Sequence, residues 1–204
     1  MVVEDIPKLY TALAEWLPCV LILLTHKKHL ANQRVLRTGI AFAVSLAMLC
    51  AIQLFCGTVS GILWLLGMLV AIAVMIATIK ISLDIPCIEA LYYTAGAFMW
   101  AEFVASLEWQ LETYYAHRLS DPLLFCRLIF LFIYTAVFWV FYLCERLVWR
   151  DFFEKYFISI SAGDIFRVWI SVLVFFSLSN LSYVRIDSPF SGASLTEISI
   201  SELL

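Results

Sequence analysis

Long apolar stretches separated by short polar segments fill most of this chain. Each stretch is close to the roughly 20 residues that a helix needs to cross a bilayer. Strict apolar alternation, which a membrane barrel strand requires, is missing, and an unpaired backbone cannot face lipid. The pattern therefore predicts an all-α polytopic membrane protein. Its six expected transmembrane helices cover residues 6–25, 38–55, 62–81, 86–107, 122–143 and 165–184.

The composition supports a membrane protein with a single domain. Hydrophobic residues make up 64% of the 204 residues and charged residues only 14%, and the mean hydropathy is +0.96. So little polar surface cannot cover a water-soluble globule. We expect a transmembrane domain over residues 1–192 and a short polar tail over 193–204, with the lipid bilayer as the main partner. The net charge of −3 sums loops on two sides of the membrane and indicates no nucleic-acid partner.

Basic residues near the ends of the spans are unevenly distributed. Cytoplasmic loops of membrane proteins are enriched in lysine and arginine. We therefore expect a multi-pass cell-membrane protein whose amino terminus and carboxyl tail are extracellular. The face predicted to be cytoplasmic carries Lys27, Lys28, Arg34, Arg37, Lys80, Arg146, Arg150 and Lys155, with Arg167 close to it, and the opposite face carries Lys8, Arg118, Arg127 and Arg185.

Charged residues inside the spans are the candidate functional residues. An ionised side chain at the bilayer centre costs about 2.5 to 3.5 kcal/mol, so it needs a partner or a role. Glu15 stands midway along the first span, Glu102 stands deep in the fourth, and Arg127 enters the outer part of the fifth. The expected topology allows an ion pair between Glu102 and Arg127. Trp109 belongs to an acidic, aromatic rim that also contains Glu108, Glu112, Tyr114 and Tyr115.

Two interpretations of these residues stay open. Glu15, Glu102, Trp109 and Arg127 either form a ligand-binding or signal-coupling site, as a ligand pocket or proton path that opens outward, or they are paired or snorkelling groups that only fix helix packing. The rim residues are also typical of an aromatic belt at the membrane interface.

The loop after the fifth span predicts an amphipathic helix at the cytoplasmic membrane surface. Its aromatic residues recur with the spacing of one helix face, and charged residues occupy the other face. Such a helix either anchors the bundle or transmits a tilt change between two spans. The aromatic face consists of Trp149, Phe152, Phe153, Tyr156 and Phe157.

The sequence contains no arrangement of residues that points to catalysis. Zinc-protease, phosphate-loop and serine-hydrolase motifs are missing, and His26 and His29 lie in a basic segment that repels a cation. We expect no catalytic residues, no metal site and no cofactor. The cysteines are dispersed singly and are interpreted as small hydrophobic residues; they are Cys19, Cys50, Cys56, Cys87, Cys126 and Cys144.

Short motifs and the span plan resemble a known family. The opening run PKLYTALAEWL at 7–17, the run SNLSY at 179–183 and the run SPFSG at 188–192 are similar to the membrane sensor region of bacterial GHKL-type sensor histidine kinases. Quorum-sensing peptide receptor kinases belong to this class.

The resemblance implies a signal-sensing input module of a two-component system. Its implied partners are an extracellular peptide or small-molecule signal and a homodimer or a full-length kinase. Relatives continue through a further span into a kinase domain, whereas this chain ends first, so we expect that it does not transfer phosphate alone. A small transporter or permease component that uses buried carboxylates is the alternative, and a nonfunctional fragment is another. The sequence shows no pair of similar halves of the kind that builds many transporters.

Overall fold

The protein is an α-helical bundle. The computed structural model describes residues 7–25, 35–59, 62–116, 122–150 and 160–184, and no strand occurs among them. The helices are α1 (Lys8–Thr25), α2 (Val35–Cys56), α3 (Ile62–Leu83), α4 (Cys87–Ala116), α5 (Pro122–Cys144), the π-helical segment η3 (Glu145–Arg150) and α7 (Ala162–Val184). The predicted all-α fold class is confirmed, and a helix occupies each of the six predicted regions.

Four of these helices are long and apolar enough to cross a membrane. They are Lys8–Thr25, Leu36–Cys56, Ile62–Leu83 and Arg127–Leu147. The expectation of six such helices is thus met only in part, since α4 and α7 are outside this group. The physical reason in α4 is its glutamates, which include Glu89, Glu102 and Glu108.

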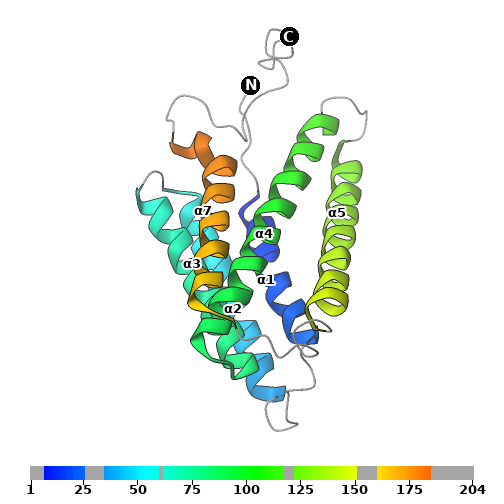
Figure 1. Ribbon diagram of the computed structural model, residues 1–204. Coiled ribbons are helices and arrows are strands. Elements are labelled where there is room, and N and C mark those ends of the chain that lie inside the picture. The colour runs from blue at the N-terminus through cyan, green and yellow to red at the C-terminus, as the bar shows by residue number, and fades with distance from the viewer. Residues whose placement is uncertain (1–6, 26–34, 60–61, 117–121, 151–159, 185–204) are drawn as a thin grey trace.

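The central helix of the bundle is α4. It packs against α1, α3, α5 and α7, and Figure 1 shows it between α5 on one side and α7 on the other. Successive helices run in alternating directions, so α1 begins and α7 ends at the same end of the bundle. Because α4 is surrounded by other helices, much of its surface contacts protein. In α2, α3, α5 and α7, by contrast, one face carries large exposed apolar side chains.

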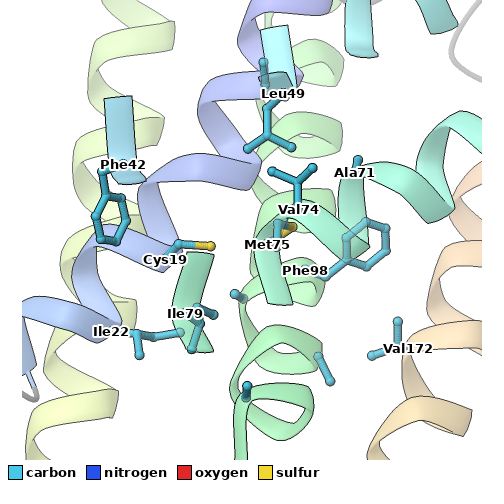
Figure 2. Packing of buried hydrophobic residues seen from close by; sticks show 14 of the residues in the cluster. Cys19, Ile22, Phe42, Leu49, Ala71, Val74, Met75, Ile79, Phe98 and Val172 are labelled. Atoms are coloured by element: carbon cyan, nitrogen blue, oxygen red, sulfur yellow. The ribbon is translucent and has the colours of Figure 1, made fainter. Parts of the chain in front are cut away.

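Buried side chains recur every three or four residues along the helices, which is the spacing of one helix face. In α3 the buried face includes Met68, Ala71, Met75 and Ile79. Figure 2 shows Val74 of α3 facing Leu49 of α2, and these residues belong to one apolar cluster that also contains Cys19 of α1 and Phe98 of α4. The interior is therefore formed jointly by α1 to α4.

Local sequence signals explain where several helices begin and end. Pro18 lies inside α1, which is continuous across it. Asp84 ends α3 with a positive φ of 57°, and its N–H donates to the carbonyl of Lys80 at 2.9 Å. Asp is among the few residues that adopt this left-handed conformation readily. Ser161 caps the start of α7 through hydrogen bonds with Asp164.

The largest difference from the predicted boundaries is in α4. This helix continues to Ala116, whereas the predicted span ends at residue 107. Hydropathy detects where an apolar stretch ends, but the helical hydrogen bonds continue through the more polar residues that follow it, because glutamate and glutamine are good helix formers.

Candidate functional site

A buried glutamate and a buried glutamine connect two helices inside the bundle. Glu15 lies on the buried face of α1 with Ala12 and Cys19, and its side chain is 1% exposed. Its Oε1 accepts a hydrogen bond of 2.6 Å from Nε2 of Gln53, which is 2% exposed on α2. The same Nε2 lies 3.6 Å from the sulfur of Met68 on α3. This contact is a direct polar link between α1 and α2.

The sequence analysis identified Glu15 but missed Gln53. A signal was available, since Gln53 is the only side-chain amide within the predicted span 38–55. An amide inside an apolar helix needs a hydrogen-bond partner for the same reason that a charge does.

Glu102 is the second predicted residue at this location. It lies on α4, partly buried, and its carboxylate is within electrostatic reach of Glu15. The structure therefore brings two of the predicted residues together, and it does so with like charges rather than opposite ones.

Two further groups extend this site toward α5. Glu108 of α4 is 0% exposed, so it belongs to the interior rather than to the predicted rim. The hydroxyl of Tyr134 lies within electrostatic reach of Glu108 and Glu15, and it donates a 2.7 Å hydrogen bond to the carbonyl of Tyr10. We refer to Glu15, Gln53, Glu102, Glu108 and Tyr134 as the polar cluster. Trp109, a predicted site residue, is buried next to Glu108 along α4.

Arg127 lies elsewhere. It is exposed on α5. The rings of Trp100 on α4 and Phe141 on α5 are 5.5 Å apart, which fixes how the two antiparallel helices align. At 1.5 Å per residue, this alignment separates the levels of Arg127 and Glu102 by roughly 18 Å along the helix axis. The structure does not bring these two residues together, so the expected ion pair is not formed.

The predicted amphipathic helix falls largely outside the described residues. Phe152, Phe153, Tyr156 and Phe157 are in the segment 151–159, which the structure does not describe. The backbone of Trp149 belongs to η3, but its side chain is outside the described part as well.

A third buried carboxylate, which the sequence analysis missed, lies at the opposite end of the bundle. Glu145 begins η3 and is 8% exposed. Tyr92 and Tyr93 of α4 lie within its electrostatic reach. It is therefore separate from the polar cluster.

The polar cluster offers acidic and hydrogen-bonding groups. It can hold a proton or bind a positively charged group. Within the described part of the chain, no group of three or more histidine, cysteine or acidic residues could hold a metal ion. The described cysteines are free thiols; they are Cys19, Cys50, Cys56, Cys87 and Cys144.

Comparison with protein-family models, curated proteins and solved structures gives no match to this chain.

Proposed function

We propose that this chain is the signal-sensing input module of a membrane receptor, of the kind found in GHKL-type sensor histidine kinases. In this proposal the six helices cross the bacterial cell membrane, with the polar cluster in the outer half and η3 toward the cytoplasm. An extracellular peptide or small molecule is the signal, and a kinase domain is the output.

The packing around α4 and α7 supports six crossings. The glutamates of α4 lie in a helix that four others surround, and intramembrane carboxylates are tolerated where they face protein instead of lipid. On α7, Phe166, Ile170 and Leu173 are exposed, as expected for a lipid-facing helix. Trp64 of α3 stacks on Phe176 of α7 with ring centroids 5.6 Å apart, so α7 runs beside a candidate span.

The hydrogen bond between Glu15 and Gln53 carries the functional proposal. It joins α1 and α2 at a point that Glu102 of α4 also reaches electrostatically. A buried hydrogen bond is costly to break. A ligand or charge that weakens this bond therefore changes the free energy of the arrangement of α1 and α2 that contains it, relative to an arrangement that lacks it. A signal can act only through such a difference between states.

The side chains that lie between this bond and the opposite end of the bundle favour sensing over transport. Ile22, Met75, Ile79 and Phe98 follow Glu15 toward the other end of the bundle, and all four are buried in one apolar cluster. A transporter needs polar groups or water along its path. In the described residues, no buried acidic or basic side chain lies between the polar cluster and Glu145, and buried hydroxyls there, such as those of Thr78 and Thr94, donate to carbonyls of their own helices.

Reconstitution into liposomes tests this function. The purified chain is placed under a pH gradient, with a pH-sensitive dye inside, and a peptide fraction from spent bacterial culture medium is added. Sensing predicts a change in tryptophan fluorescence without flux, and Glu102→Gln reduces that change. Glu89→Gln, at the other end of α4, is the matched control and keeps it. Uptake driven by the pH gradient and lost in Glu102→Gln would instead establish the transporter alternative.

A further inference from the structure

The two carboxylate oxygens of Glu15 have different surroundings. Oε1 accepts the hydrogen bond from Gln53 at 2.6 Å. Oε2 is buried and has no hydrogen-bond partner among the described residues. A carboxylate oxygen that is removed from water and receives no donor is strongly destabilised in its ionised form.

The charged and titratable groups around Glu15 do not compensate for this oxygen. Lys8, the basic residue of α1, is about two helical turns away, with its aliphatic stem against Gly57. On the described part of α3, the residue that lies beside Gln53 is Met68, which is uncharged. Lys80 is exposed at the opposite end of α3. The groups that face Glu15 or its neighbours from α1, α2, α4 and α5 are Cys19, Cys56, Glu102, Glu108 and Tyr134. These groups are either neutral or acidic, while the basic Lys8 also reaches Cys56 electrostatically.

We propose that Glu15 is a proton-binding site of the bundle, in which Oε2 carries the proton and Oε1 keeps its bond to Gln53. The neutral acid removes the repulsion between Glu15 and Glu102. It also leaves no ionised charge on the oxygen that receives no hydrogen bond.

Release of this proton to water leaves a carboxylate on α1 that faces a carboxylate on α4. Like charges in a low-dielectric interior repel one another strongly. Loss of the proton therefore loosens α1 against α4 at the end of the bundle that contains Leu9 and Gln110, both of which are exposed. Proton binding itself does not depend on the proposed function, whereas its use in signalling does.

Infrared spectroscopy of the full chain in lipid nanodiscs tests the proton site. A protonated carboxyl group has a C=O stretch that is separate from those of carboxylates and amides. At neutral pH the protein is expected to show this band, and Glu15→Gln is expected to lose the component that belongs to Glu15. Because Oε2 of Glu145 is also buried without a hydrogen-bond partner among the described residues, all proteins compared carry Glu145→Gln. Asp84→Asn, which changes an exposed carboxylate at the other end of the bundle, is the control and keeps the band.

A second variant keeps the test decisive if Glu15→Gln does not fold. Gln53→Leu removes the donor to Oε1 and has nearly the same side-chain volume. The band is expected to remain and to shift to higher wavenumber, because the C=O group loses a hydrogen bond.

Spin labels at positions 9 and 110 test the conformational part. Raising the pH until the band disappears is expected to increase the distance between the labels, and Glu15→Gln is expected to remove this pH dependence.

Three results would overturn the proposal. The first is a neutral-pH spectrum without a protonated carboxyl band, the second is a band that is unchanged in Glu15→Gln, and the third is a label distance that stays constant while the band disappears. None of these measurements involves a signal molecule or flux, so their failure is distinguishable from failure of the proposed function.

Discussion

Cys56 of α2 lies so close to Gly67 of α3 that a methyl group at position 67 would overlap its sulfur atom. Both residues are buried, and the Cys56 thiol also lies 3.9 Å from the carbonyl of Trp64. The close approach of α2 and α3 at this point therefore requires the missing side chain of glycine.

Gly67→Ala is expected to destabilise the bundle by about 1 to 3 kcal/mol, the usual cost of overpacking a core. Cys56→Ala in the same chain removes the overlapping sulfur and is expected to recover much of that loss. Reversible unfolding in mixed detergent micelles measures both effects. Strictly additive losses in the double variant would show that the two residues do not determine this packing.

Tyr134→Phe is expected to lower the free energy of unfolding by about 0.5 to 1.5 kcal/mol. It removes the 2.7 Å hydrogen bond to the Tyr10 carbonyl, which joins α5 to the start of α1. Tyr142→Phe is the matched control, because the Tyr142 hydroxyl makes only an exposed contact of 3.5 Å with Arg146. Equal losses in the two variants would contradict a structural role for the Tyr134 bond.

Substitutions of Asp84 test why the turn between α3 and α4 adopts its conformation. Since its φ is 57°, Asp84→Ala is expected to cost about 1 to 2 kcal/mol, while Asp84→Gly is expected to keep or raise stability. Asp84→Asn removes the charge but still adopts the left-handed conformation, so it separates the backbone effect from the electrostatic one. The same unfolding measurement applies. Equal free energies of unfolding for Asp84→Ala and Asp84→Gly would refute the conformational explanation.

The stability of the first turn of α7 is expected to depend on pH. Hydrogen bonds from the Ser161 hydroxyl at 2.7 Å and the Ser161 N–H at 3.1 Å hold the pKa of Asp164 below its usual value. The stability of this cap is therefore complete above the ordinary aspartate pKa and is lost as the pH falls through the lowered value.

Amide hydrogen exchange in the first turn of α7 measures this dependence. Protection is expected to decrease at acidic pH in the wild type. Ser161→Ala is expected to have lower protection throughout and a weaker pH dependence. An unchanged pH profile in that variant would show that the cap is not its origin.

The sequence predicted the helices well where an apolar stretch has clear polar ends. The predicted starts at residues 62 and 122 coincide with those of α3 and α5. The end of α4 was missed by nine residues, because hydropathy and helical hydrogen bonding end at different positions. The sequence predicted six membrane-crossing helices, whereas four of the described helices are long and apolar enough to cross a membrane and α4 is not among them.

The site was predicted in part for a related reason. Glu15 and Glu102 stood out as acids in apolar stretches, and the structure brings them within electrostatic reach of each other. The expected partner of Glu102, Arg127, is at another level of the bundle, because the alignment of α4 and α5 depends on contacts such as that between Trp100 and Phe141. Such contacts join residues that are distant in sequence and leave no local pattern.

The amino-acid sequence by itself determined that the chain is helical and contains stretches long and apolar enough to cross a membrane, and in lipid each such stretch must satisfy its own backbone hydrogen bonds. It also determined which residues are costly to bury. The tertiary structure alone decided how those residues are accommodated: Gln53 is the donor to Glu15, and Glu108 is interior instead of part of a rim. These outcomes depend on helix rotation and alignment, which packing between helices sets and a single helix does not encode.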